Sequence, residues 1–261
     1  MDCKVAFQTA NLCHNFTAMF LPSFLSRIKS ACIQLLMATG LLSACSKSKH
    51  AQWTTPADYY ALPRWSEKVA AFQKVQHPPH TCTLFIGDSI TEGFDVNYFF
   101  NDSTVVNMGI GGDFTQGVLR RLDPIAVLQP RKIFLMIGIN DVLKREPVQV
   151  ITDNHAKIVQ SLRSQCPQAE IYIQSILPIH SSYVVRDHGK KVNTQVVLDE
   201  IISINAQLQH TCTQYQATYV DLHKDFTNER GRLRKELTYD GLHLNHNGNQ
   251  VWTTLIRPLM Q

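Results

Sequence analysis

The sequence of 261 residues lacks several features that mark particular protein classes. Its charge is nearly balanced, with 25 Lys and Arg against 21 Asp and Glu, and its basic residues are scattered apart from one run at Arg230, Arg232, Arg234 and Lys235. Such a short run is typical of a solvated face, so we expect no nucleic-acid partner. Internal repeats and low-complexity tracts are also missing, which argues against a repeat architecture. Cysteine and histidine nowhere show the short spacing of a zinc site, so the sequence predicts neither a metal nor an organic cofactor.

The N-terminal part has the layout of an export signal. Arg27 and Lys29 precede an apolar stretch from 31 to 42 that is too short to span a bilayer comfortably, and small residues follow it. Residues 1–18 fit no part of this layout, whereas a start at Met19 would give the signal ordinary proportions. We therefore expect a signal peptide over 1–44, with the true start possible at Met19.

The sequence Leu-Ser-Ala-Cys that ends this segment resembles the lipobox of bacterial lipoproteins. The resemblance implies cleavage before Cys45 and lipidation of that cysteine, which would anchor the protein to a lipid bilayer of the bacterial cell envelope. Ser46 does not resemble the aspartate that retains some lipoproteins at the inner membrane, so outer-membrane or periplasmic placement is the expectation. The polar residues 45–55 would form a tether, and 56–261 a single catalytic domain.

Cysteines are too few in the expected mature chain to build a disulfide framework. Of the seven in the sequence, three leave with the signal and Cys45 would be acylated. Only Cys82, Cys166 and Cys212 remain, and three thiols cannot all pair, although an exported protein is in a compartment that permits disulfides. Core burial must therefore stabilise the domain.

From residue 83 onward, short apolar runs rich in β-branched residues alternate with longer stretches of helical period. This alternation predicts a three-layer α/β/α fold with a five-stranded parallel sheet. The expected strands are Thr83 to Gly87, Thr104 to Met108, Lys132 to Ile137, Glu170 to Ser175 and Thr218 to Asp221. The expected helices are Trp65 to Gln76, Gln116 to Leu128, Val148 to Gln165, Asn193 to Tyr215 and Asn247 to Met260. Residues 178–192, with Pro178, His180, Tyr183, His188 and Gly189, have no clear period and are expected to form a long loop.

Four polar blocks fall where this fold places a ligand crevice, outside the carboxyl ends of the parallel strands. They are Gly87-Asp88-Ser89 after the first strand, Gly109-Ile110-Gly111-Gly112-Asp113 after the second, Gly138-Ile139-Asn140-Asp141 after the third, and Asp240-Gly241-Leu242-His243 near the end. A single block of this kind is weak evidence, because turns after strands often use these residues for backbone reasons. The four together, in this order, indicate one site.

These blocks resemble those of the SGNH/GDSL hydrolases, named for Ser, Gly, Asn and His in four separate blocks. The likeness covers residues 83–257, and the contexts "LFIGDSITEGF", "VVNMGIGGDFTQGVLRRL", "IFLMIGINDVL" and "LTYDGLHLNHNG" are similar to the branch with platelet-activating-factor acetylhydrolase-like and sialate or carbohydrate O-acetylesterase-like members. The resemblance implies a flavodoxin-like fold and a carboxylic ester hydrolase. The third block has Ile139 where many members have a second glycine, a departure that keeps the amide of Asn140.

The chemistry of ester hydrolysis assigns roles to these residues. A serine hydroxyl attacks an ester only if a neighbouring base takes its proton, and an imidazole is suited to that task at neutral pH. We expect Ser89 as the nucleophile and His243 as its base, because His243 alone has a carboxylate, Asp240, three residues earlier in a family-like segment. By resemblance, the oxyanion hole consists of the backbone N–H groups of Ser89 and Gly112 and the side-chain amide of Asn140.

Other polar residues of these blocks are expected to be structural. Asp88 and Asp141 would stabilise loops through backbone hydrogen bonds. Five further histidines are read as surface or packing residues, with His180 and His188 retaining a chance of touching substrate: His180, His188, His210, His223 and His246.

Three other functions are compatible with parts of this pattern. A nucleotide-binding loop is disfavoured, because the dinucleotide fingerprint needs a glycine at the position of Phe114 and no Lys-Ser or Lys-Thr pair follows. A catalytically silent cell-surface module that binds glycan or lipid is a second alternative, although all four block residues and Asp240 are present. Acyl transfer to a glycan is the third.

The substrate is less defined than the reaction. We expect a small acyl ester, an acetyl group on a carbohydrate above all, with a lysophospholipase or thioesterase activity as the alternative. Residues 178–192 are expected to shape the side that holds the leaving group.

Overall fold

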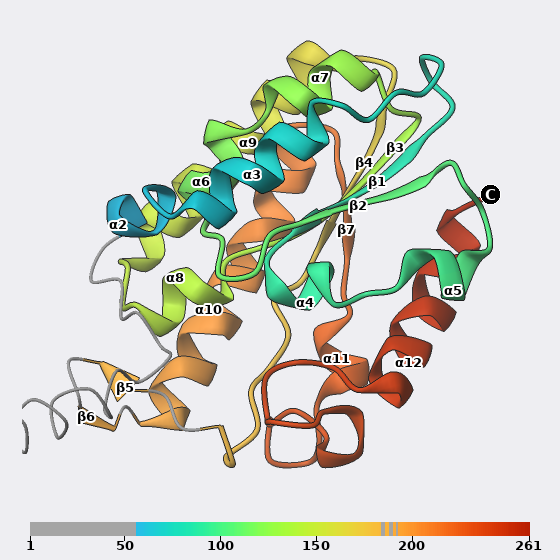
Figure 1. Cartoon of the computed structure of the whole chain (residues 1–261). Helices are drawn as coiled ribbons and strands as arrows, with labels where there is room; N and C mark the ends of the chain where they lie inside the picture. Colours follow the sequence, from blue (N-terminus) through green and yellow to red (C-terminus); the bar gives the residue numbers. More distant parts are fainter. Residues whose placement is uncertain (1–55, 184–185, 188–189, 192) are drawn as a thin grey trace, which may run out of the picture. The chain divides into compact units, whose positions relative to one another are not determined.

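Five parallel strands form a single sheet in the computed structural model, which describes residues 56–183, 186–187, 190–191 and 193–261 (Figure 1). The strands are β1 (Thr83–Gly87), β2 (Val105–Gly109), β3 (Lys132–Met136), β4 (Glu170–Gln174) and β7 (Thr218–Val220), in the order β2-β1-β3-β4-β7. The predicted strands are therefore confirmed to within a residue or two at each end. The predicted signal, Cys45 and the tether lie outside the described residues.

Helices cover both faces of the sheet (Figure 1). On one side lie α3 (Pro63–Phe72), α6 (Thr115–Arg120), α7 (Asp123–Leu128), α9 (Val148–Gln165) and α10 (Thr194–Gln214); on the other lie α5 (Val96–Phe100) and α12 (His246–Ile256). The described chain also has shorter helices: α2 (Pro56–Tyr60), α4 (Ser89–Glu92), α8 (Ile139–Leu143), α11 (His223–Phe226), and the 3-10 helices η1 (Lys235–Leu237) and η2 (Arg257–Leu259). This arrangement is the three-layer α/β/α fold that the sequence predicts. Within the described residues, no helix is both apolar enough and long enough to span a membrane.

A row of aromatic side chains runs across the sheet on the face that α12 covers. Phe85, Phe134 and Tyr172 are register partners on β1, β3 and β4, and their rings stack with centroids 5.0 and 4.6 Å apart. Trp252 of α12 is fully buried and stacks on Phe94 at 4.4 Å. Aromatic burial of this kind is a large contribution to core stability, and it fixes α12 against the strands.

The prediction of one helix over 116–128 is wrong, because this segment forms two helices, α6 and α7. The chain leaves helical geometry at Arg121, with φ −125°, and resumes as α7 with Pro124 in its first turn. Proline lacks the N–H that a continuous helix needs and disfavours helical geometry in the residue before it. The break also turns the Arg121 side chain into the core, where it is 1% exposed.

The loop predicted over 178–192 also contains regular structure. Residues Arg186–Asp187 (β5) and Lys190–Lys191 (β6) pair as a short antiparallel ladder, while His188 and Gly189 lie outside the described residues. Strands of two residues are too short to show a sequence period, so this ladder could not be recognised from the pattern.

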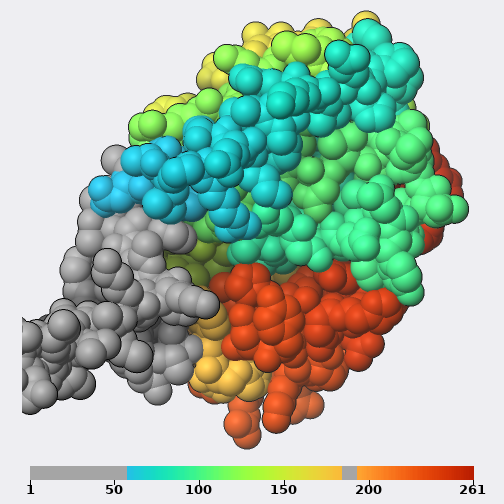
Figure 2. Space-filling model, in the orientation of Figure 1, coloured from blue at the N-terminus to red at the C-terminus, as the bar shows by residue number. Residues whose placement is uncertain are grey.

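The strand order places the crevice of the fold beside β1. Since β1 lies between β2 and β3, the chain crosses the sheet in opposite directions on its two sides, and ligands in such sheets bind at that switch point outside the carboxyl ends of the strands. The chain after β1, β2 and β3 therefore meets at one edge. Figure 2 shows the C-terminal segment, in orange to red, adjoining the green surface of the residues around α4 and α5.

Candidate active site

Ser89 is presented by a tight turn at the carboxyl end of β1. All five residues of this strand are buried, and α4 begins immediately after Asp88. The carboxylate of Asp88 caps the helix by accepting the N–H of Ile90 at 2.9 Å. A Cβ at Gly87 would overlap Thr91 Oγ1 and the carbonyl oxygen of Met136, so only glycine allows the helix to fold back this closely. Ser89 is therefore fixed at the first position of α4.

His243 reaches Ser89 from the opposite end of the sequence. Its Nε2 lies 2.9 Å from Ser89 Oγ, and its Nδ1 lies 2.6 Å from Asp240 Oδ2. The other carboxylate oxygen of Asp240 accepts the backbone N–H groups of Leu242 and His243. The three side chains that the sequence singles out thus form one hydrogen-bonded chain, and Asp240 holds the imidazole in the tautomer that leaves Nε2 free to accept a proton.

Asp240 remains ionised to acidic pH. Partial burial would raise the pKa of its carboxyl, but the hydrogen bonds from the His243 side chain and from the N–H groups of Leu242 and His243 outweigh this and lower the pKa below its usual value. A carboxylate that stays charged can stabilise an imidazolium when one forms beside it.

The glycine and asparagine blocks are linked to the segment that carries Ser89. Gly112 has φ 85°, a left-handed conformation that favours glycine. The neighbouring Gly111 donates its N–H to Glu92 Oε2 at 2.8 Å, which ties this turn to the end of α4. Asn140, in α8, donates one side-chain N–H to the carbonyl oxygen of Asp113 at 2.9 Å. The segments that carry Ser89, Gly112 and Asn140 are therefore linked to one another by direct hydrogen bonds.

A buried ion pair braces the same edge of the sheet. Arg121 Nε contacts Asp113 Oδ2 at 2.8 Å, with the two side chains 1% and 0% exposed. The guanidinium also donates to the carbonyl oxygens of Met108 and Gly87, at 2.8 and 3.0 Å. Asp113 in turn accepts Nε1–H of Trp65 and the N–H of Phe114. One guanidinium thus connects the ends of β1 and β2 with the loop that follows Gly112.

Asp88 and Asp141 make structural contacts and are both almost fully buried. Asp141 accepts the N–H and the hydroxyl of Thr115, as Asp88 accepts the N–H of Ile90. Burial raises the pKa of each carboxyl to about 7, because the hydrogen bonds only partly offset the cost of a buried charge. Neither contacts Ser89 or His243 through a hydrogen bond in the described structure.

The remaining histidines are dispersed over several elements. His180 Nδ1 lies 2.8 Å from Ser182 Oγ, His223 contacts Thr227, and His246 stacks on Phe99. Of these, His180 lies beside the candidate site, because its backbone N–H donates to the carbonyl oxygen of Gly241 at 2.7 Å. The described start of the 178–192 segment therefore packs directly on the loop that carries Asp240 and His243.

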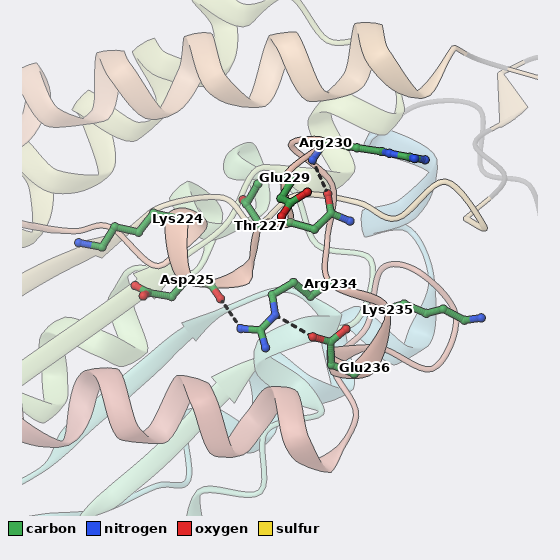
Figure 3. Close-up of a pocket in the computed structure, with 9 residues that line it drawn as sticks. Lys224, Asp225, Thr227, Glu229, Arg230, Arg234, Lys235 and Glu236 are labelled. Atoms are coloured by element: carbon green, nitrogen blue, oxygen red, sulfur yellow. Dashed lines mark hydrogen bonds and ion pairs between the residues drawn. The ribbon is translucent and has the colours of Figure 1, made fainter.

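Three residues of the basic run, Arg230, Arg234 and Lys235, line a surface hollow of about 710 Å³ that contains none of the residues in the Ser89 chain (Figure 3). Arg234 lies between Glu236 and the carbonyl oxygen of Asp225, and it bonds to both. The hollow is lined by both acidic and basic side chains: Lys224, Asp225, Glu229, Arg230, Arg234, Lys235 and Glu236. This mixture suits a solvated face. Across the described residues, no cluster of three or more His, Cys, Asp or Glu is arranged to hold a metal ion.

Several residues of the site have no role in the sequence-based assignment. Glu92, Asp113 and Arg121 hold the glycine turn, and Tyr239 stacks on the imidazole of His243 with ring centroids 5.8 Å apart and planes 10° apart. For Tyr239 the sequence offered a signal, an aromatic residue directly before the Asp-Gly-Leu-His block. The contacts of Arg121 join four separate segments and have no local signature.

Known proteins and protein families resemble this chain. The sequence model of the GDSL-like lipase/acylhydrolase family matches residues 85–251. The platelet-activating factor acetylhydrolase IB subunit alpha1 of Bos taurus is 27% identical over 172 residues, which cover 63% of this chain and 68% of that protein.

Solved structures have the same fold. A protein from Streptococcus pneumonia, provisionally described as a platelet activating factor, is 29% identical, with a TM-score of 0.68 and coverage of 78% of this chain and 96% of that one. An acetyl xylan esterase is 20% identical, with a TM-score of 0.57 and coverage of 72% and 100%. The second likeness concerns the fold alone.

Proposed function

Since the chain belongs to the SGNH/GDSL hydrolase family, the GDSL-like lipases and acylhydrolases, and is a carboxylic ester hydrolase, we propose that it works through a catalytic triad of Ser89, His243 and Asp240. One observation carries the proposal: Ser89 Oγ, the two imidazole nitrogens and Asp240 Oδ2 form an unbroken chain with separations of 2.9 and 2.6 Å. Both distances are within the range required for proton transfer.

The proposed reaction follows from that chain. Ser89 Oγ attacks the ester carbonyl carbon while His243 Nε2 takes the hydroxyl proton. The tetrahedral intermediate collapses, the bond to the leaving alkoxide breaks, and Nε2 returns the proton to that oxygen, which leaves an acyl group on Ser89. Water then attacks the acyl-serine, with His243 again taking and returning one proton, and releases the carboxylic acid. Asp240 stabilises the imidazolium in both halves.

The oxyanion would be held by the N–H of Ser89, the N–H of Gly112 and the amide of Asn140. The side-chain amide of Asn140 has two N–H bonds, of which one is used on the carbonyl oxygen of Asp113. That contact fixes the amide and leaves its second N–H for the substrate. Donors fixed before the reaction stabilise the developing charge without reorganisation, and losing one costs about 100- to 1000-fold in kcat.

For the substrate we propose a small acyl ester, an acetyl group on a carbohydrate. The names of two similar proteins, a platelet-activating factor acetylhydrolase and an acetyl xylan esterase, both specify an acetyl ester. We also propose that the signal over 1–44 directs export and that Cys45 is lipidated, which would anchor the enzyme to the bacterial cell envelope.

Hydrolysis of p-nitrophenyl acetate, butyrate and octanoate tests the proposal. Wild-type protein should hydrolyse the acetate fastest, and folded Ser89→Ala and His243→Ala proteins should lose at least about a thousandfold in kcat/KM. His246→Ala, which removes a nearby histidine that stacks on Phe99, is the matched control and should stay near wild type.

Other outcomes would redirect the assignment. Equal activity in all these proteins would refute the triad, and a preference for octanoate would refute the small acyl group in favour of a lysophospholipase or thioesterase. Product analysis with and without a sugar acceptor separates hydrolysis from acyl transfer.

A further inference from the structure

We propose that Tyr239 is the platform on which the leaving group rests, and that this leaving group is a sugar ring; the inference builds on the proposed esterase function. Tyr239 is 70% exposed although it is a large aromatic residue. It lies directly before Asp240, and its ring is stacked on the His243 imidazole with centroids 5.8 Å apart and an interplanar angle of 10°.

The chemistry of the reaction determines which part of the substrate meets Tyr239. His243 Nε2 must return a proton to the leaving oxygen, which therefore lies within about 3 Å of that nitrogen in the reacting complex. The acyl carbonyl, in contrast, is bonded to Ser89 and faces the donors around Gly112 and Asn140. A side chain that stacks on the imidazole consequently borders the alcohol half of the ester.

The backbone on both sides of Tyr239 is held rigidly. The Thr238 hydroxyl donates to the carbonyl oxygen of His243 at 2.7 Å and accepts the N–H of Gly241 at 2.8 Å. Asp240 accepts two further backbone N–H groups from the same loop. Because the aromatic ring is presented on a fixed loop, a substrate that stacks on it meets a surface ordered in advance and loses less free energy to ordering.

Packing does not account for so much exposed aromatic surface at this position. The other strongly exposed large hydrophobic residues of the described chain are Tyr98, Val127, Val150, Val196 and Ile202, and all of them lie on helices. Tyr239 is on the catalytic loop, and no aliphatic member of this set accompanies it there. An isolated aromatic face without an aliphatic groove does not suit an alkyl chain.

The neighbouring rim offers polar groups instead. The N–H of His180 bonds to the carbonyl oxygen of Gly241, and a Cβ at Gly241 would approach Ser182 Oγ at 2.9 Å and the Tyr183 N at 2.8 Å. The segment from His180 to Tyr183 thus packs one residue away from Asp240. A sugar ring has C–H bonds that pack on an aromatic face and hydroxyls around its edge, so it matches one exposed tyrosine beside hydroxyl and imidazole groups.

Two acetyl esters with different leaving groups test the inference. Acetate release is measured from xylose tetraacetate, whose leaving group is a sugar ring, and from 2,2,2-trifluoroethyl acetate, whose leaving group has no ring. Tyr239→Ala should lower kcat/KM for the sugar ester about five- to tenfold, which is the loss expected when one aromatic contact is removed. Its kcat/KM for the trifluoroethyl ester should stay within twofold of the wild-type value. Tyr239→Phe, which keeps the ring, should stay near wild type on both.

Tyr98→Ala is the matched control, because Tyr98 is similarly exposed, at 66%, but contacts Phe99 and His246 instead of His243. An equal loss on both esters in Tyr239→Ala would overturn the inference and make Tyr239 a positioning residue for the imidazole. Unchanged kinetics on both, or wild-type activity on trifluoroethyl acetate without activity on the sugar ester, would also overturn it. Failure of the proposed function looks different, because Ser89→Ala would then match the wild type on both esters.

Discussion

The buried pair of Asp113 and Arg121 provides a sharp test of how the site is held together. Replacing Arg121 by methionine keeps much of the side-chain volume but removes the charge. Asp113, which is 0% exposed, would lose its ionic partner, and the carbonyl oxygens of Met108 and Gly87 would lose their donors. Breaking a buried pair from one side costs about 3 to 5 kcal/mol of unfolding free energy, because an uncompensated charge remains inside.

The same substitution should affect catalysis through Asn140. Its amide is held by the carbonyl oxygen of Asp113, so loosening Asp113 should lower kcat more than it raises KM. Arg121→Lys keeps the charge but has only one nitrogen to share among three acceptors. Its kcat should lie between those of Arg121→Met and the wild type, and it should stay folded enough for kinetics.

Urea unfolding of Arg121→Met, Asp113→Leu and the double variant measures the coupling free energy between the two side chains of the ion pair. If the reasoning is right, the double variant is less destabilised than the sum of the singles by at least about 1 kcal/mol, because neither charge is left alone. Additive effects of the two substitutions, or a loss of less than about 1 kcal/mol of unfolding free energy in Arg121→Met, would show that the ion pair does not stabilise this part of the fold.

Three further predictions concern individual residues. Asn140→Ala should lower kcat about 100- to 1000-fold with little change in KM, and a loss below tenfold in steady-state kinetics would remove it from the oxyanion hole. Asp88→Asn should flatten the pH dependence of stability. Its folded pKa of about 7 is raised from the ordinary 3.8, so the folded state binds more protons across that window and stability falls as pH rises through it. Urea unfolding from pH 4 to 8 should show a slope reduced by roughly 1 kcal/mol per pH unit, and an unchanged slope would contradict the burial argument. Cys45→Ala should abolish incorporation of a labelled fatty acid in a bacterial host and release the protein from the membrane fraction, whereas retained label would place the modification elsewhere.

The sheet was predictable because its signals are local. Each strand is a short apolar run ended by glycine or a polar residue, and a parallel sheet brings the ends of β1, β2 and β3 to one edge whatever the details of packing. The contact between Ser89 and His243 across 154 residues was therefore accessible from the order of four motifs.

Most of what the sequence missed depends on contacts between distant segments. The helix over 116–128 breaks at Arg121 for two reasons. One is local, because Pro124 interrupts the helix; the other is distant, because the guanidinium finds acceptors on β1, β2 and the glycine loop. Helical periodicity records neither effect. The place of Tyr239 directly before the Asp-Gly-Leu-His block is visible in the sequence, but its stacking on His243 depends on how the loop that carries both residues folds.

Labelling with a fluorophosphonate tests the central claim most directly, because this reagent reacts with a serine only when a base activates it. The account predicts a single adduct on the peptide that contains Ser89, no adduct in Ser89→Ala, and labelling slowed at least about a hundredfold in His243→Ala. An adduct on another residue, or an equal labelling rate in His243→Ala, would contradict the account.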